Sequence, residues 1–114
     1  MSFKDEVAQD VLLLTLEGDL IGGEDTQGIL ERVQQHIDQG ILRCVVDIAD
    51  VRFLNSNGLG FLITILTKFR NKEGELVVIH PSEQVKQLLI ITKLNSIFNV
   101  LVDKEEAFKR LAKI

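Results

Sequence analysis

The stretch at residues 45–61, VVDIADVRFLNSNGLGF, decides the fold and raises the main question about function. It starts as an apolar strand, passes through a short polar turn, and resumes as an apolar helix. Ser56 lies in that turn between two asparagines, shortly before Gly58. A serine between a strand and a helix can act as a helix cap, a nucleophile or a phosphorylation site.

The composition of the chain is that of a globular protein with an aliphatic core. Of its 114 residues, 46% are hydrophobic, 26% are charged and only 5% are aromatic. This length predicts a single domain over residues 1–114. Seventeen acidic residues against thirteen basic ones give a formal net charge of -4. That balance argues against direct nucleic-acid binding, which depends on Lys and Arg contacts to phosphates.

Three features of the sequence predict a cytoplasmic protein. No apolar run approaches the roughly 20 residues needed to span a bilayer, so we expect no membrane insertion. The first ten residues, MSFKDEVAQD, are charged where a secretory signal needs an apolar stretch. Cys44 is the only cysteine, which excludes an intramolecular disulfide framework. Within a strand we expect Cys44 to act as a small hydrophobic residue.

Strand and helix patterns alternate along the chain. Strands are predicted at residues 3–8, 11–16, 42–48, 75–79 and 97–102. Helices are predicted at residues 24–39, 58–69 and 82–91, and after Asp103. Ser82 and Asp103 are expected to cap the last two helices, and Ala107, Phe108 and Leu111 form the inner face of the final one.

This order of elements predicts an α/β fold. We expect a mostly parallel sheet of four to five strands with an N-terminal antiparallel hairpin and about four helices. Functional sites in such sheets gather in loops after the carboxyl ends of the strands. The loops at residues 18–23 and 50–57 both follow such strands, and we expect them to lie side by side and form the site.

Nucleotide and metal chemistry are not expected. The loop at residues 18–23 has glycines near the spacing of a phosphate-binding loop. Glu24 and Asp25 follow where that loop needs Lys and Ser or Thr, and their charge would repel a nucleotide. His36 and His80 lie in different elements without Cys or acidic ligands at metal-binding spacing, so we expect no metal or other cofactor.

Ser56 lacks the sequence context of a hydrolase nucleophile. A nucleophilic serine needs a base, usually histidine, that a third group orients. We expect His36 on a solvated helix face and His80 beside a turn, neither at the sheet edge with an acid partner. Leu54 and Asn55 precede Ser56, so the Gly-x-Ser-x-Gly turn is absent. We therefore expect no enzymatic activity.

Two interpretations of Ser56 stay open on the residues alone. Asn55, Ser56 or Asn57 can each cap the helix that opens at Gly58, because their side-chain oxygens accept bonds from free N–H groups. Phosphorylation of Ser56 would instead add a charge of about −1.5 to −2, which the amino terminus of a helix tolerates. That phosphate would obstruct a protein interface and leave the fold intact.

The motif VDIADVRFLNSNGLG at residues 46–60, together with the element order, resembles the STAS domain family. More narrowly, the chain resembles the bacterial anti-sigma factor antagonists. The resemblance covers essentially the whole chain, including LEGDL at residues 16–20, the strand at 74–79 and the segment at 81–94. The family motif, D-S-S/T-G-L-G, is fairly specific when it follows an apolar strand and opens a helix.

The resemblance implies a partner-switching function. The unphosphorylated antagonist of this family binds an anti-sigma factor that is also a serine kinase, and thereby frees a sigma factor for transcription. The kinase phosphorylates the motif serine, which falls on Ser56, the complex dissociates, and a serine phosphatase resets the cycle. The partner-binding residues implied by the resemblance are Gly22, Gly23, Asn55, Ser56, Asn57, Gly58 and Leu59.

The chain departs from the family pattern at three positions. Asn55 replaces the aspartate of the motif, which removes a negative neighbour from Ser56. Asn57 replaces the second Ser or Thr, which leaves one hydroxyl in the turn. Ile21 stands where the family often has an acidic residue.

Two other functions remain as alternatives. The first is a STAS scaffold that is not phosphorylated, or an accessory subunit of a signalling complex or lipid transporter, and the two asparagines favour it. The second is a small-ligand sensor with a pocket between the two loops, which the absence of Trp and Tyr disfavours. The sequence is compatible with a monomer or a weak dimer.

Overall fold

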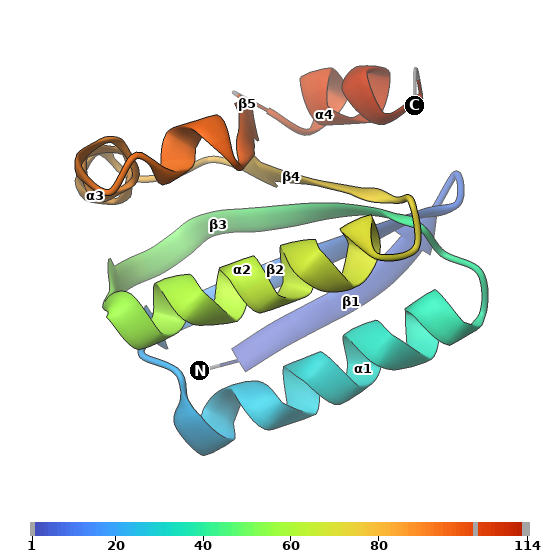
Figure 1. Ribbon diagram of the computed structural model, residues 1–114, viewed down its shortest axis with the longest axis horizontal. Helices are drawn as coiled ribbons and strands as arrows, with labels where there is room; N and C mark the ends of the chain where they lie inside the picture. Colours follow the sequence, from blue (N-terminus) through green and yellow to red (C-terminus); the bar gives the residue numbers. More distant parts are fainter. Residues whose placement is uncertain (1, 102, 113–114) are drawn as a thin grey trace.

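The computed structural model describes residues 2–101 and 103–112 and contains a five-stranded sheet with helices on both faces (Figure 1). The strand order is β1-β2-β3-β4-β5. The first two strands pair antiparallel and the others pair parallel, as predicted. The strands are β1 (Ser2–Ala8), β2 (Val11–Leu20), β3 (Arg43–Leu54), β4 (Glu75–Ile79) and β5 (Asn99–Leu101).

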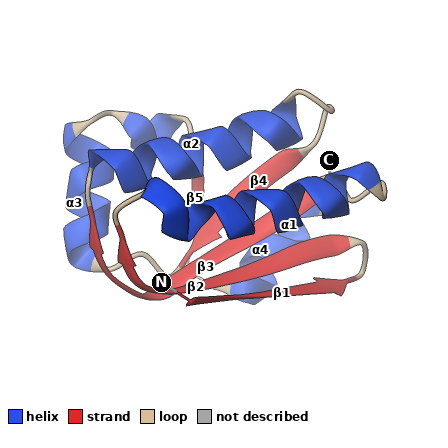
Figure 2. Ribbon diagram, turned by 90° about the horizontal axis from the view of Figure 1, so that it is seen from below, coloured by secondary structure: helices blue, strands red, loops and turns tan. Residues whose placement is uncertain are grey.

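Four α-helices and two short 3-10 turns connect these strands within the described residues. The helices are α1 (Gln27–Asp38), α2 (Ser56–Arg70), α3 (Glu83–Ile91) and α4 (Lys104–Leu111), and the 3-10 turns are η1 (Gly23–Thr26) and η2 (Leu94–Ser96). Figure 2 shows α1 and α2 over one face of the sheet and α4 behind the other. The molecule therefore has three layers, with the sheet in the middle.

The central strands are buried on both faces, which explains their nearly continuous apolar sequence. Successive side chains of a strand point to opposite faces. In β2, Leu12 and Leu14 join the large core under α1 and α2, whereas Val11 and Leu13 join a smaller core under α4. The smaller core contains Val11, Leu13, Val45, Val77, Ile79, Ala107 and Leu111.

The hairpin between β1 and β2 closes through the expected two-residue turn. Gln9 and Asp10 both have positive φ, 54° and 62°, as a type I′ turn requires. This turn places Ala8 opposite Val11, and it fixes the register of the whole hairpin.

Both strands that lead to the site are longer than predicted. β2 continues to Leu20 and β3 to Leu54, so half of the loop expected at 18–23 and more than half of the loop expected at 50–57 are strand. The parallel pairing between them is interrupted by two register shifts, at Thr15/Glu17 and at Gly18/Asp19. Such irregularities break the alternation of side chains, and the sequence pattern fades while the backbone pairing continues.

Other boundaries differ by smaller amounts. The helix expected at 24–39 divides into η1 and α1, and α2 begins at Ser56 rather than at Gly58. β5 ends at Leu101, and Val102, which we expected to end this strand, lies outside the described residues. Ser82 and Asp103 cap α3 and α4 as predicted, by accepting bonds from the amides of Val85 and Glu106.

The expectation that His36 lies on a solvated face is wrong. His36 is only 9% exposed, and its Nε2 lies 2.8 Å from Oδ2 of Asp5 on β1. Arg32 donates from Nε to the same oxygen at 2.8 Å. Burial alone would raise the pKa of Asp5, but the bonds with His36 and Arg32 outweigh it and hold that pKa below its ordinary value. This cluster fastens β1 to α1.

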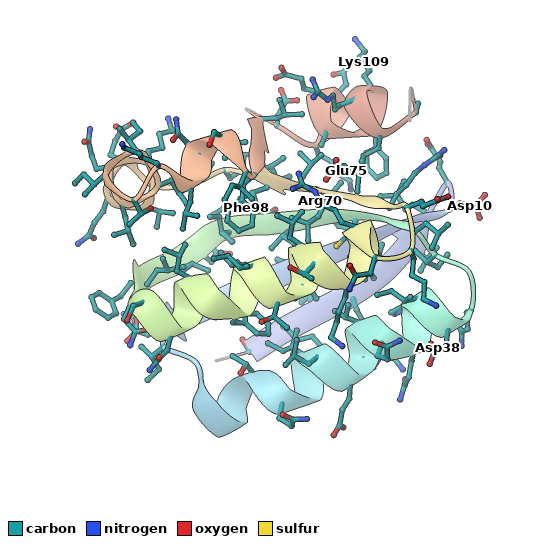
Figure 3. All side chains as sticks on the ribbon, viewed as in Figure 1. Asp10, Asp38, Arg70, Glu75, Phe98 and Lys109 are labelled. Atoms are coloured by element: carbon teal, nitrogen blue, oxygen red, sulfur yellow. The ribbon has the colours of Figure 1, made fainter. Side chains whose placement is uncertain are left out.

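A second polar contact fixes the carboxyl-terminal part of the fold. Figure 3 shows Arg70, at the end of α2, reaching toward Glu75 at the start of β4, and the two pair at 3.2 Å. Arg70 also donates from Nη2 to the carbonyl oxygen of Ile97 at 2.9 Å. The neighbouring Phe98 is 2% exposed and belongs to the large core. These contacts hold the segment before β5 against the sheet.

Candidate functional site

The candidate site lies where β2 and β3 end side by side and α2 begins. Leu20 pairs with Leu54 at the ends of the two strands. One residue further on, the amide of Asn55 donates to the carbonyl oxygen of Leu20 at 3.3 Å. The expected neighbourhood of the two segments is confirmed, because the backbones themselves are hydrogen-bonded.

Asn55, and not Ser56, caps helix α2. The Asn55 backbone is extended, and its Oδ1 accepts a hydrogen bond from the amide of Gly58 at 2.9 Å. Ser56 is therefore the first residue of the helix, and its side chain is exposed. Within residues 2–101 and 103–112 the Ser56 hydroxyl makes no hydrogen bond, so it is available to react with a partner.

Two glycines allow the turn to pack tightly. A Cβ added to Gly58 would collide with the carbonyl oxygen of Leu20, so the helix start and the end of β2 approach backbone to backbone. Gly22 has a φ of +79°, and a Cβ there would lie 2.8 Å from Cβ of Asn57. The glycines thus set how closely the segment after β2 approaches the Ser56 turn.

The predicted partner-binding residues divide into exposed and buried ones. Ser56, Asn57 and Gly23 are exposed. Gly58 is buried, and Leu59 is 7% exposed and packs in the large core. Gly58 and Leu59 therefore shape the turn and offer little surface of their own.

Two large apolar side chains flank the turn on the outside. Ile21, directly after β2, is 45% exposed, and Phe53, near the end of β3, is 47% exposed. Phe53 could not be recognised from the sequence pattern, because it falls in a segment predicted as a loop, where no inward or outward side is defined. We refer to Ile21, Phe53, Ser56 and Asn57 together as the Ser56 surface.

A mostly apolar groove lies between the end of β3 and α3. It has a volume of about 280 Å³ and is lined by Arg52, Leu54, Gln84, Val85, Gln87, Leu88 and Ile91. Ile90 and Ile91, at the end of α3, are 54% and 75% exposed. Arg52 forms one wall and lies 3.6 Å from a carboxylate oxygen of Asp19 on β2. The exposed apolar area is thus broader than the turn alone.

The expectation that neither histidine has an acid partner at the end of a strand is wrong. His80 directly follows β4 in a left-handed conformation, with φ of 58°, and its Nδ1 lies 3.1 Å from Oδ1 of Asp47. Asp47 precedes the end of β3 by seven residues, or roughly 20 Å of strand. This pair is too far along the strand to activate Ser56.

Metal binding and thiol chemistry find no support at the site. Within the described part of the chain, no three His, Cys, Asp or Glu side chains converge as a metal site requires. Cys44 is fully buried, and that burial raises the pKa of its thiol. Cys44 therefore packs as a hydrophobic residue, as predicted.

A five-stranded mixed sheet in this order with helices on both faces is the fold of a STAS domain. The chain belongs to the STAS domain family, whose model matches residues 2–107. It is similar to BtrV of Bordetella bronchiseptica, which is assigned as an anti-sigma factor antagonist. The two are 25% identical over 97 residues, which make up 85% of this chain and 83% of BtrV.

Solved structures of anti-sigma factor antagonists share the fold. One from Thermotoga maritima has a TM-score of 0.84 at 21% identity, over 96% of this chain and 94% of that one. Unphosphorylated SpoIIAA gives 0.77 at 19% identity, over 99% and 100% of the two chains. Phosphorylated SpoIIAA from Bacillus gives 0.74 at 20% identity, over 96% and 98%.

The described residues contain no helix that combines the length and the apolar character needed to cross a membrane.

Proposed function

We propose that this protein is an anti-sigma factor antagonist that binds an anti-sigma factor serine kinase and is released when the kinase phosphorylates Ser56. In this way it would regulate sigma-factor-dependent transcription. The observation that carries the proposal is the free, exposed hydroxyl of Ser56 at the first residue of α2, next to a cap that Asn55 already supplies.

The position of Ser56 suits a phosphate that leaves the fold unchanged. The first amides of α2 point toward the helix start, and the helix dipole favours a negative charge there. The cap bond between Asn55 and Gly58 does not involve the serine, so phosphorylation breaks no bond of the native helix.

The same phosphate would oppose docking of a partner. Ile21 and Phe53 offer exposed apolar area close to Ser56 in the sequence and at the joined ends of β2 and β3, and a partner that covers this surface would also cover the serine. Burying a phosphate of about −1.5 to −2 charge without a matching cation carries a large desolvation cost. Phosphorylation would therefore weaken the complex by acting at the centre of the interface.

The relatives support this proposal. SpoIIAA is known in an unphosphorylated and a phosphorylated form, and both share the fold of this chain. By this analogy we propose a non-enzymatic, cytoplasmic, single-domain regulator over residues 1–114, reset by a serine phosphatase. Gly22, Gly23, Asn57 and the cap residue Asn55 would border the kinase in the complex.

Phosphate mapping and binding measurements test the proposal. The anti-sigma factor serine kinases encoded in the same genome would each be incubated with the protein and Mg-ATP. We expect one kinase to transfer a single phosphate, which mass spectrometry locates on Ser56. Ser56→Ala should accept no phosphate and still bind that kinase. Ser56→Asp should bind it at least about tenfold more weakly.

Ser96→Ala is the matched control, because Ser96 is also exposed but lies in η2. This variant should be phosphorylated and bind as the wild type does. Phosphate on another residue, or equal kinase binding by Ser56→Asp and wild type, would contradict the switch. Stable binding to a signalling complex or transporter subunit without phosphorylation would instead support the scaffold function.

A further inference from the structure

The outer edge of β1 is an unpaired strand edge. β1 is the first strand in the sheet order, and no described strand lies beyond it. Figure 1 shows it in blue at the border of the sheet, and Figure 2 shows the same edge open at the bottom of the view. An edge of seven residues is long enough to pair with another strand.

The turn decides which backbone groups face this free edge. A type I′ turn joins the carbonyl of Ala8 to the amide of Val11, so these two residues form a hydrogen-bonded pair. Hydrogen-bonded and non-hydrogen-bonded pairs alternate along an antiparallel ladder. The amides and carbonyls of Phe3, Asp5 and Val7 consequently point away from β2, toward solvent.

The side chains of β1 are self-complementary in one register. A two-fold axis perpendicular to the sheet at Asp5 places Lys4 opposite Glu6 of a second copy, twice. It also places Phe3 opposite Val7, twice, on the face that carries α1. Lys4 and Glu6 are exposed, and Val7 is 46% exposed, so all three are free to form these pairs.

Neighbouring registers are unfavourable. A shift by two residues in one direction places Lys4 opposite Lys4, and in the other direction it places Glu6 opposite Glu6. Like charges directly opposite one another destabilise a strand pair. In the favoured register the two Asp5 residues meet at the axis, but each already carries Arg32 and His36 of its own copy as partners.

We propose that β1 is a dimerisation edge, at which two copies of this chain join their sheets through antiparallel β1–β1 pairing centred on Asp5. The amides and carbonyls of Phe3, Asp5 and Val7 complete the ladder between the copies. Two Lys4–Glu6 ion pairs set the register. The two sheets become one ten-stranded sheet, and the two Ser56 surfaces lie at opposite edges of it, because the axis reverses the direction of the strands.

Charge reversal tests the register directly. Sedimentation equilibrium of the wild type at up to about 1 mM should show a reversible monomer–dimer equilibrium. Lys4→Glu and Glu6→Lys should each weaken the association at least about tenfold, because each creates two like-charge pairs. The two single variants mixed in equal amounts should associate with each other at wild-type strength or better, since every pair is then complementary.

Lys109→Glu is the matched control. It makes the same change in net charge on α4, where Figure 3 shows Lys109 pointing away from the sheet, and it should dimerise as the wild type does. A monomeric wild type at about 1 mM overturns the proposal. So does a dimer that Lys109→Glu weakens as much as Lys4→Glu does, or a mixture that associates no better than either variant alone.

Discussion

At the residue scale, the main feature of the site is that Asn55 and Ser56 have different roles at the start of α2. The amide side chain of Asn55 stabilises the helix start, and the adjacent hydroxyl stays free. The sequence alone is compatible with a cap at any of three residues, Asn55, Ser56 and Asn57. Only the extended backbone of Asn55 and its bond to Gly58 decide between them, because all three side chains have the required oxygen.

The cap can be tested by substitution. Asn55→Ala should lower the free energy of unfolding by about 1 kcal/mol, since the amide of Gly58 loses its acceptor. Asn55→Asp keeps an acceptor oxygen and should be at least as stable as the wild type, because a carboxylate also suits the helix dipole. Urea denaturation measures both, and equal stability of Asn55→Ala and wild type would contradict the assignment.

Replacing each of the two glycines of α2 by alanine should change the free energy of unfolding in opposite directions. Gly58→Ala should cost about 2 kcal/mol or more, because the new Cβ collides with the backbone oxygen of Leu20, which cannot rotate away. Gly60→Ala finds no atom within 4 Å of the new Cβ and should stabilise the helix by about 0.5–1 kcal/mol. Thermal unfolding of both variants measures the two effects, and a Gly58→Ala variant as stable as the wild type would contradict the close approach to Leu20.

At the element scale, the contact between β1 and α1 is the main feature that the sequence did not reveal. Asp5 and His36 are 31 positions apart, and their side chains meet across two layers. Helical spacing placed His36 next to Ile37 on the helix, but it could not show that the carboxylate of Asp5 on β1 lies within hydrogen-bonding distance of its ring. Polar contacts between distant elements leave no periodic signal, so they could not be predicted.

The contact of Asp5 with His36 and Arg32 should make the free energy of unfolding depend on pH in the acid range. The pKa of Asp5 is lowered in the folded state, so the unfolded chain binds the proton more readily. The stabilisation is complete above the unfolded pKa of about 4 and is lost as the pH falls through the folded value. Asp5→Asn should therefore be less stable than wild type at pH 7, by about 1 kcal/mol, and the difference should shrink below pH 4.

Acid titrations of stability with Glu6→Gln as the control separate this effect from a general loss of charge. Glu6 neighbours Asp5 on β1 but is exposed on the other face of the strand. Its substitution should leave the stability within about 0.5 kcal/mol of wild type at every pH. A constant difference between Asp5→Asn and wild type from pH 7 to pH 3 would contradict the role of the Asp5 carboxylate.

Element boundaries near the site were the least predictable part of the fold. β4 was predicted to the residue, because its apolar run is bounded by a turn on each side. β2 and β3 exceed their apolar runs, since register shifts carry the pairing on through polar residues. The meeting of the two strand ends was nevertheless predicted correctly, because the carboxyl ends of parallel strands lie at one edge of a sheet.

At the scale of the whole molecule, a charge at Ser56 should change binding without changing the fold. Ser56→Asp should raise the free energy of unfolding by about 0.5 kcal/mol at low salt, through the dipole of α2. Ser56→Lys should lower it by a similar amount. Both effects should fade in 1 M salt, where exposed charges are screened.

Far-UV circular dichroism and urea denaturation of the three proteins measure this prediction. The spectra should coincide, because the Ser56 side chain forms no bond within the described residues that a substitution could break. A Ser56→Asp variant that is clearly unfolded or expanded would show that the position cannot carry a phosphate in the native state.

The layered architecture followed from the sequence because strand and helix alternate with only short connections. The apolar run of β3 also indicated burial on both faces, which the two cores confirm. What could not be predicted is the order of the strands in the sheet. Because β2 to β5 follow one another in that order, right-handed crossovers place α1, α2 and α3 over one face, and α4 covers the other.

Because Cys44 is buried, the reactivity of its thiol reports when the core of the protein opens. This sulfur, the sole thiol in the chain, belongs to the second residue of β3, the central strand of the sheet, and is fully buried in the large core. A thiol reagent can reach it only when the central strand separates from its neighbours. The rate of its modification therefore follows the opening of the core itself, with no engineered label and no change at Ser56.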